Sequence, residues 1–311
     1  MKDISGLFGL QYPIVQGGMI WCSGWELAAS VSNAGGLGTI GSGSMYPDVL
    51  RDQIRKCKAA TDRPFAVNLP LIYPQVADHI QIILEEKVQV VITSAGNPKL
   101  YAKTFKSEGC KLIHVVSSSK FAIKAQEAGC DAVVAEGFEA GGHNGREETT
   151  TLCLIPQVVD AVTIPVIAAG GIADGRSMLA AFALGAQGVQ MGSRFVACLE
   201  SSAHEAFKQA VIAAKEGDTH LTLKEITPVR LLNNPFADQV RLAYHNGATN
   251  DELKALLGRG RAKKGMFEGD MIDGELEIGQ VSARLDNIYS AKQIIDQTMV
   301  EFKTAFQKMS L

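Results

Sequence analysis

The sequence predicts an α/β chain: a (β/α)8 TIM barrel with a smaller, mainly helical cap inserted before the C-terminal helix. Three observations predict this class. Eight short apolar runs alternate with amphipathic stretches up to about residue 192, and such alternation indicates a parallel sheet. The repeats are about 25 residues long, which suits a closed barrel of eight strands. Beyond about residue 203 the alternation stops.

The apolar runs are short and mostly β-branched, as buried parallel strands are. They lie at residues 13–15, 37–40, 65–69, 88–92, 112–116, 132–135, 164–168 and 188–191. An open, doubly wound sheet is the alternative, and it requires a glycine fingerprint of defined spacing after the first strand. Gln16-Gly17-Gly18-Met19 does not have that spacing, so the barrel is favoured.

The stretches between the runs have helical spacing. Helices are expected at residues 25–33, 48–60, 77–86, 99–108, 120–128 and 175–184. Several end at a glycine, such as Gly109, Gly129 and Gly185, and glycine is the residue that most often ends a helix.

The cap is predicted over residues 203–278, which show no strand-like pattern. Helices are expected there at residues 205–216, 238–246 and 251–257, followed by a basic segment, Arg259-Gly260-Arg261-Ala262-Lys263-Lys264. The barrel then comprises residues 1–202 and 279–311. A long amphipathic helix within residues 278–309 returns to it.

Composition and charge argue against several functions. With 30 Lys and Arg against 33 Asp and Glu, the net charge is −3, whereas nucleic-acid binders need a basic surface. The six cysteines are scattered, which indicates reduced, mostly buried thiols and no metal site. The apolar runs are too short to span a membrane, and the N-terminus lacks a signal-peptide pattern. We therefore expect a cytoplasmic protein without nucleic-acid or membrane partners.

Two glycine-rich loops follow the seventh and eighth strands. They are Ala169-Gly170-Gly171-Ile172-Ala173-Asp174-Gly175 and Met191-Gly192-Ser193-Arg194-Phe195. Barrels bind phosphate at these loops through backbone N–H groups and a helix N-terminus. They predict a phosphate site, with two ordinary βα turns as the alternative.

The loop after the sixth strand is polar and flexible, and it carries His143 beside two glycines, Gly141 and Gly142. Imidazole titrates near neutrality and can transfer a proton. This pattern favours a catalytic role over a structural one. His114, inside the fifth strand, is expected to be a pocket-wall or core residue.

Three other strands end in residues suited to a flat ligand. The Gly17-Gly18 pair allows the backbone to approach a ligand closely, although a tight turn is the simpler explanation. Asn68 and Ser94 end the third and fourth strands. They would hydrogen-bond a heterocycle or cap the next helix.

Taken together, these segments resemble the flavin-dependent barrel family that contains nitronate monooxygenases and the FMN-type enoyl-acyl-carrier-protein reductase II. The resemblance covers about two-thirds of the chain. Its segments, in order, are Tyr12-Pro-Ile-Val-Gln-Gly-Gly-Met19, Ser32-Asn-Ala-Gly-Gly-Leu-Gly38, Pro64-Phe-Ala-Val-Asn68, Ser94-Ala-Gly-Asn-Pro98, Ala135-Glu-Gly-Phe-Glu-Ala-Gly-Gly-His143, Ile167-Ala-Ala-Gly-Gly-Ile-Ala-Asp-Gly175 and Gln190-Met-Gly-Ser-Arg-Phe195.

The resemblance implies FMN as cofactor. It assigns the isoalloxazine contact to Gly17, Gly18 and Met19. It assigns bonds to the ring or ribityl chain to Asn68 and Glu136. It assigns the phosphate to Gly170, Gly171, Gly192 and Ser193. Ser94, Gly141 and Gly142 are expected in the same cofactor site, and His143 would handle the proton.

Two segments resemble the reductase branch: the loop from Glu139 to Thr151, and Gly279-Gln280-Val281-Ser282-Ala283. They imply an NADH- or NADPH-dependent reductase that passes hydride from FMN to a trans-2-enoyl thioester in fatty acid synthesis. The partner would be an acyl carrier protein. Such carriers are acidic, so the segment from Arg259 to Lys264 is either their docking patch or a solvated helix end.

Two alternatives stay open. One is a nitronate monooxygenase, in which oxygen reoxidises the flavin and a small nitronate is the substrate. The other, of a different class, is a non-catalytic flavin- or phosphate-binding barrel. The resemblance also implies a homodimer and raises a monovalent cation as a further ligand, for which the sequence shows no cluster of ligating residues.

Overall fold

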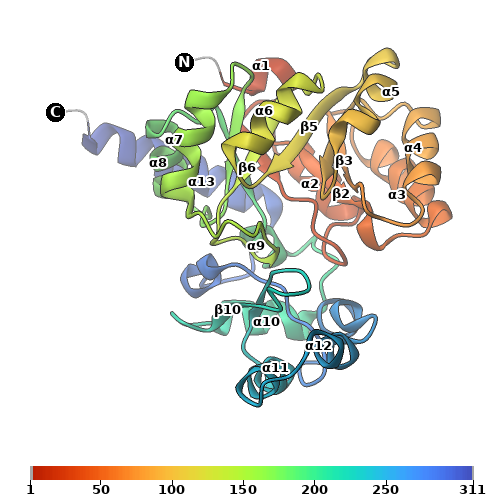
Figure 1. Cartoon of the computed structure of the whole chain (residues 1–311). Helices are drawn as coiled ribbons and strands as arrows, with labels where there is room; N and C mark the ends of the chain where they lie inside the picture. The colour runs from red at the N-terminus through yellow and green to blue at the C-terminus, as the bar shows by residue number, and fades with distance from the viewer. Residues whose placement is uncertain (1–2, 310–311) are drawn as a thin grey trace.

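The structure is a computed structural model and describes residues 3–309. Residues 1, 2, 310 and 311, which the predicted barrel includes, lie outside the described residues. Eight parallel strands form one sheet in the order β1-β9-β8-β6-β5-β4-β3-β2. A parallel bridge between Val15 and Leu37 joins the two end strands. The predicted (β/α)8 barrel is therefore confirmed (Figure 1).

The barrel strands lie within two residues of the predicted ranges. They are β1 (Ile14–Gln16), β2 (Gly38–Gly41), β3 (Phe65–Pro70), β4 (Val90–Ser94), β5 (Lys111–Val116), β6 (Ala132–Glu136), β8 (Val166–Ala169) and β9 (Gly188–Met191). Successive side chains point to opposite faces of a strand. Ile92 accordingly belongs to the cluster that fills the barrel, and Val91 to the layer beneath the outer helices.

The outer helices are α2 (Trp25–Asn33), α3 (Pro47–Ala60), α4 (Val76–Glu85), α5 (Ala102–Ser107), α6 (Ser119–Glu127), α7 (Thr151–Ala161), α8 (Gly175–Ala183) and α13 (Ala291–Met309). The predicted helix at 99–108 is divided into η2 (Pro98–Leu100) and α5. Short helix α1 (Ser5–Phe8) contributes Phe8 to the cluster inside the barrel. None of the helices within residues 3–309 has the length and apolar character needed to cross a bilayer.

The cap contains α10 (Glu205–Ala213), α11 (Pro235–His245), α12 (Asn250–Leu257) and the short helical turns η3 (Lys263–Phe267) and η4 (Gln280–Arg284). The expectation of no strands here was wrong. Strands β10 (Thr219–Thr222) and β11 (Val229–Leu232) pair antiparallel. Each has only four residues, and the buried Arg230 interrupts the apolar pattern of β11, so neither gives a strand-like signal.

The cap sheet includes a strand from the barrel. β7 (Gly142–His143), from the loop after β6, pairs with β11, so that Val229 lies opposite His143 and Arg230 opposite Gly142. In Figure 1 the cap lies against the end of the barrel where α9 (Ser193–Val196) follows β9. The cap therefore holds the loop that carries His143.

Candidate functional site

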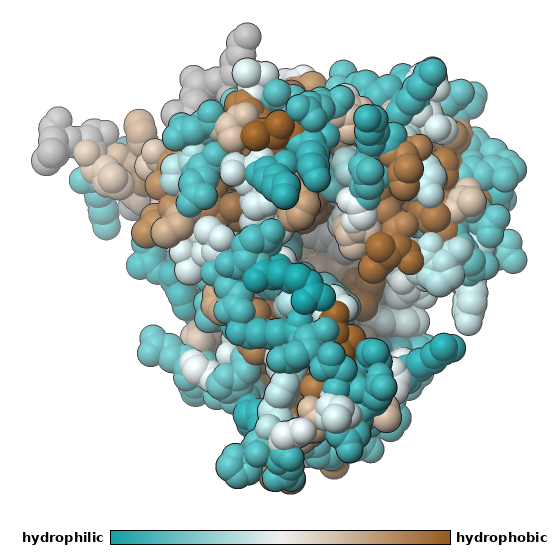
Figure 2. All heavy atoms as spheres, viewed as in Figure 1, coloured by the Kyte–Doolittle hydropathy of each residue, from teal (hydrophilic) through white to brown (hydrophobic). Residues whose placement is uncertain are grey.

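A cleft of about 1100 Å³ lies at the carboxyl ends of the barrel strands, bordered by the cap. Pockets for a single small ligand usually measure about 300–1,000 Å³, so this one has room for more than one ligand. Figure 2 shows it as a hollow with hydrophobic residues on its wall. All thirteen residues selected from the sequence line it: Gly17, Gly18, Met19, Asn68, Ser94, Glu136, Gly141, Gly142, His143, Gly170, Gly171, Gly192 and Ser193.

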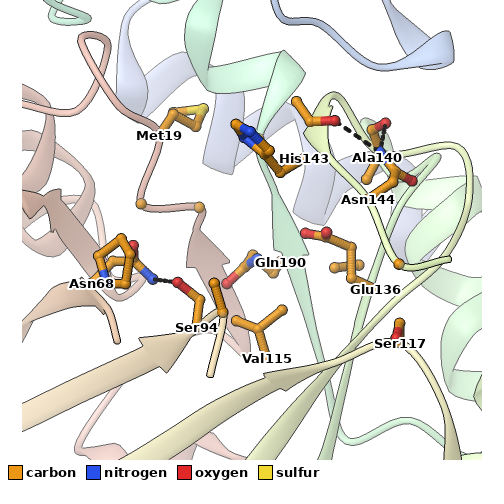
Figure 3. Close-up of a pocket in the computed structure, with 18 of the residues that line it drawn as sticks. Met19, Asn68, Ser94, Val115, Ser117, Glu136, Ala140, His143, Asn144 and Gln190 are labelled. Carbon is orange, nitrogen blue, oxygen red and sulfur yellow. Dashed lines mark hydrogen bonds between the residues drawn. The ribbon is translucent and has the colours of Figure 1, made fainter. Parts of the chain in front are cut away.

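The loop after β1 is fixed by buried polar side chains. Gln16 accepts a hydrogen bond from the Thr39 amide at 2.8 Å and donates to Ser23 Oγ at 2.9 Å. The Met19 amide donates to the same hydroxyl at 3.0 Å. These bonds hold Met19 over the cleft, across from Asn68 and Ser94 (Figure 3).

Polar side chains from three strands form the floor of the cleft. Asn68 Nδ2 donates to the Ile92 carbonyl at 3.2 Å and to Ser94 Oγ at 3.4 Å. Gln190, on β9, is only 9% exposed, and its Oε1 has no hydrogen-bond partner among the described residues. A buried acceptor without a partner is costly, so a ligand with an N–H or O–H group fits here. Gln190 is a site residue that sequence reasoning missed, although a polar residue beside Met191-Gly192 in an apolar strand is a usable signal.

The loops after β8 and β9 form a cradle of backbone groups. Gly170 and Gly171 have φ of 94° and 67°, a conformation that favours glycine. Their N–H groups donate to no group in the described part of the chain. Ser193 Oγ accepts the Gly279 amide at 3.0 Å and keeps its own proton to donate. This arrangement suits an anion such as phosphate.

One expectation about this cradle changes. The N-terminus of α8 is closed by the Asp174 side chain, which accepts from the Ser177 amide at 2.8 Å. The Gly175 amide donates to Glu301. The α8 helix end is therefore already occupied, and the loop amides are what remains for an anion.

The cleft fits FMN on three grounds: a backbone cradle for the phosphate, an unpartnered buried Gln190 oxygen, and the close approach of the glycine loop after β1 to Asn68. The residues that would hold the cofactor are those named from the resemblance, together with Gln190.

The His143 loop is fixed from both sides. Asn144 Nδ2 donates to the Ala140 and Gly142 carbonyls at 3.0 Å each, and the Asn144 amide donates to Pro228 at 2.9 Å. The Glu139 carboxylate accepts from Thr151, both from its amide and from its hydroxyl at 2.8 Å.

Arg230 is the buried anchor of this loop. It is 1% exposed and donates to the Phe138 carbonyl through Nε at 3.2 Å and Nη2 at 2.9 Å. Its guanidinium also lies 4.5 Å from the centre of the Phe138 ring. The cap therefore positions the loop through both backbone pairing and a charged side chain.

His143 is exposed and lines the cleft. Partial desolvation lowers the pKa of His143, and the nearby Glu275 carboxylate opposes this. The imidazole is thus mostly neutral near pH 7. His114 is buried and shares a 2.8 Å hydrogen bond with Thr93 Oγ1. Burial lowers the pKa of His114 to about 4, so it is a neutral wall residue, as expected.

Glu136 ends β6, and its carboxyl group points into the cleft (Figure 3). Burial raises the pKa of Glu136 to about 7. Glu277, from the segment before η4, also lines the cleft. It is the second residue that sequence reasoning missed, since only the fold brings it beside Gly142.

The outer part of the cleft is apolar with basic residues at its rim. Lys99, Phe121 and Lys124 line it beside Ile72, and Ile72 is 74% exposed. Among the described residues, Lys99 and Lys124 form no ion pair.

Three of the four basic side chains in the segment that the sequence singled out already have partners in the protein. Arg261 donates to three backbone carbonyls, Lys263 pairs with Glu268 at 2.9 Å, and Lys264 pairs with Asp270 at 3.1 Å.

A (β/α)8 barrel with an anion cradle after its last two strands, and a histidine over the same cleft, has the arrangement of a phosphate-binding barrel enzyme. The chain belongs to the nitronate monooxygenase family, whose sequence model matches residues 2–81 and 72–301.

Three relatives show how wide this family is. FabK from Thermotoga maritima has 44% sequence identity and a TM-score of 0.94, with 99% of this chain and 98% of that chain covered. A probable nitronate monooxygenase of Staphylococcus saprophyticus is 34% identical, covering 95% of this chain and 96% of the relative. The third relative, from Rhodococcus jostii, is a (3aS,4S,5R,7aS)-5-hydroxy-7a-methyl-1-oxo-octahydro-1H-indene-4-carboxyl-CoA dehydrogenase. It is 36% identical, and the match covers 94% of this chain and 93% of the relative.

Proposed function

We propose that this protein is an FMN-dependent enoyl-acyl-carrier-protein reductase that uses NADH or NADPH. The observation that carries the proposal is the likeness to FabK, an enoyl-acyl-carrier-protein reductase II, at 44% identity over nearly the whole of both chains. Identity to the probable nitronate monooxygenase is 34%. The size and apolar outer part of the cleft also suit an acyl thioester better than a small nitronate.

FMN, when bound, would supply the redox chemistry, which is hydride transfer between NAD(P)H and the β-carbon of a trans-2-enoyl thioester. The Gly170–Gly171 amides and Ser193 would hold its phosphate, and Asn68 and Gln190 its ring. A neutral His143 would donate a hydrogen bond to the thioester carbonyl, where negative charge develops as hydride arrives. Desolvation favours this neutral form of His143.

The carrier protein would dock at the rim of the cleft rather than on the cap. The rim offers Lys99 and Lys124 without ion-pair partners in the described residues, beside the apolar side chains of Ile72 and Phe121. In the segment from Arg259 to Lys264, Lys263 and Lys264 already form ion pairs and Arg261 is bonded to backbone carbonyls, so these side chains are less available to a partner. Complementary charge steers an acidic partner to an accessible basic surface.

The test is anaerobic mixing of the purified, FMN-loaded protein with NADH or NADPH, followed by crotonyl thioester. We expect rapid bleaching of the flavin absorbance, and its recovery when the thioester is added. The absence of bleaching with either nucleotide, together with aerobic turnover of propionate-3-nitronate, would overturn the reductase in favour of the monooxygenase.

The nitronate monooxygenase is the second candidate because curated relatives of similar length carry that name. There His143 would act as a base or orient the nitronate. A non-catalytic barrel makes a different prediction: His143→Ala would retain whatever activity the wild type shows on enoyl thioesters and nitronates alike.

A further inference from the structure

The carboxyl group of Glu277 lies next to the His143 loop at an edge of the cap sheet. One edge of β11 pairs with β10, and the other pairs with β7 at Val229 and Arg230. Leu231, the next residue along, bridges to Glu277. Along this edge of β11, Glu277 therefore occupies the position that follows those of His143 and Gly142.

This placement brings the Glu277 side chain against Gly142. A Cβ built on Gly142 would stand 2.6 Å from Glu277 Oε2, so the carboxyl group uses the space that the glycine leaves free. Glu277, Gly142 and His143 all line the same cleft. The Glu277 carboxyl group therefore lies beside the residue that precedes His143 on the wall of this cleft.

The other oxygen of this carboxyl group has no partner. Glu277 Oε1 is buried and makes no hydrogen bond to any described residue. No Lys or Arg among residues 3–309 forms an ion pair with Glu277. If the group were ionised, Oε1 would have neither a hydrogen-bond donor nor a counter-charge among the described residues, so the protonated form is favoured.

The titratable groups around Glu277 are consistent with a protonated carboxyl group. Burial raises the pKa of Glu277 well above the usual range of a carboxyl group. Burial and the Glu277 carboxylate likewise raise the pKa of Glu275, although His143 and Arg261 oppose that. Near Glu277 lies the thiol of Cys22, whose pKa is raised by burial and by Glu277, with Lys208 opposing. Lys208 donates to the Leu199 carbonyl.

We propose that Glu277 is the acid that protonates the α-carbon of the substrate, with His143 holding the carbonyl. This rests on the proposed enoyl reductase function. Glu277 is a better acid than His143 because the imidazole is mostly neutral near pH 7, and a neutral imidazole is a very weak acid. Burial also raises the pKa of Glu136, but Glu136 lies at the end of a barrel strand, where the resemblance places the flavin.

The step balances as follows. The β-carbon gains hydride from the reduced cofactor, and the electron pair of the C=C bond moves to the α-carbon. That carbon takes the proton of the Glu277 carboxyl group, which becomes a carboxylate. Solvent entering as the product leaves returns the proton. NAD(P)H is the only reductant consumed.

The experiment separates the two half-reactions in the FMN-loaded enzyme. The first is anaerobic reduction of the flavin by NADH, which needs no acid. The second is reoxidation of the reduced enzyme by crotonyl thioester, followed from pH 5.5 to 9. We compare wild type, Glu277→Gln, and the matched control Glu275→Gln, which replaces a buried carboxyl group of the same segment that does not line the cleft.

In the wild type, reoxidation should slow as pH rises, because the acid loses its proton. In Glu277→Gln it should be about 100-fold slower at the acid end and nearly independent of pH, in line with the usual loss of an acid catalyst. Flavin reduction by NADH should be unchanged in this variant, which also shows that the protein is folded. Glu275→Gln should keep the pH-dependent phase, with its midpoint moved to lower pH because a neighbouring negative charge is gone.

Two outcomes overturn the proposal. If Glu277→Gln is reoxidised at the wild-type rate with the same pH dependence, Glu277 is not the acid, although the reductase function stands. If crotonyl thioester fails to reoxidise even the wild type, the protein is not an enoyl reductase, and the role of Glu277 as its acid is wrong as well.

Discussion

Gly18 lies so close to Asn68 that a Cβ on Gly18 would stand 2.2 Å from Asn68 Cβ. This contact sets how near the loop after β1 comes to the end of β3, and so it sets the width of the proposed flavin site. Gly18→Ala should force the two elements apart. We expect a loss of about 1–3 kcal/mol in the free energy of unfolding and a lower flavin-to-protein ratio, measured by urea unfolding and absorbance.

Gly6 provides the matched control, because a Cβ there would meet nothing within 4 Å. It lies in α1, where alanine is the better helix former. Gly6→Ala should therefore keep full stability and flavin content. If the two variants had the same stability and the same flavin content, the loop after β1 could move away from Asn68 at little energetic cost.

Replacing Arg230 should loosen the His143 loop more than the flavin site. Arg230→Met removes the two N–H groups that bind the Phe138 carbonyl while keeping most of the side-chain volume. Hydrogen bonds to a charged group contribute about 1.5–3 kcal/mol each. We expect faster amide exchange over residues 137–148, and a kcat that falls at least tenfold while flavin binding changes little.

Arg230→Lys tests the geometry of this anchor, since lysine keeps the charge but lacks the planar fork of donors. It should restore only part of the activity. If Arg230→Met left exchange and kcat as in the wild type, backbone pairing between β7 and β11 would suffice to position His143.

Glu136 should make stability depend on pH. Burial raises the pKa of Glu136 from 4.5 to about 7 in the folded protein. Between these values the folded state keeps a proton that the unfolded state has lost, so its stabilising effect is complete below pH 4.5 and is lost as pH rises towards 7.

Urea unfolding of flavin-free wild type and Glu136→Gln between pH 4.5 and 8 measures this effect. As pH rises, the free energy of unfolding of the wild type should fall relative to that of Glu136→Gln by up to about 1.4 kcal/mol per pH unit. The difference should become constant above pH 7. A constant difference over the whole range would place the Glu136 carboxyl group in a solvated environment.

The rim lysines should matter only for a protein-bound substrate. Lys99→Glu/Lys124→Glu should raise the KM for crotonyl-acyl-carrier protein about tenfold at low salt, and less at high salt. The KM for the small neutral thioester crotonyl-N-acetylcysteamine should not change. Arg259→Glu/Lys263→Glu is the control. If that pair raised the KM for crotonyl-acyl-carrier protein more than the rim pair did, the carrier protein would dock on the cap.

Most of the barrel could be predicted because each strand and helix carries its own periodic signal. The errors in strand bounds lie where a local contact delays the start of an element. β4 begins at Val90 rather than at residue 88 because Lys87 has a φ of 50° and the Val88 amide bonds back to Ile83. The thirteen site residues share one cleft because the barrel gathers the carboxyl ends of its strands at one face.

What the sequence could not predict depends on contacts between distant segments. β7 has only two residues, and it is a strand only because β11 lies beside it. Glu277 and Arg230 come from the cap, where no periodic pattern indicates which side chains will face the barrel. Gln190 is unpaired only in the context of the finished cleft.

The pairing of β7 with β11 also sets an order of events during synthesis. All eight barrel strands have been translated by Met191, yet the histidine loop lacks its neighbour until β11 has left the ribosome, and Gly279 comes later still. Domains tend to form from the N-terminus as the chain grows. The barrel strands of a nascent chain can therefore pair before the His143 loop is fixed. α13 arrives last, and because its Ile294 and Ile295 belong to the main core, a chain that stops within the cap would leave part of that core uncovered.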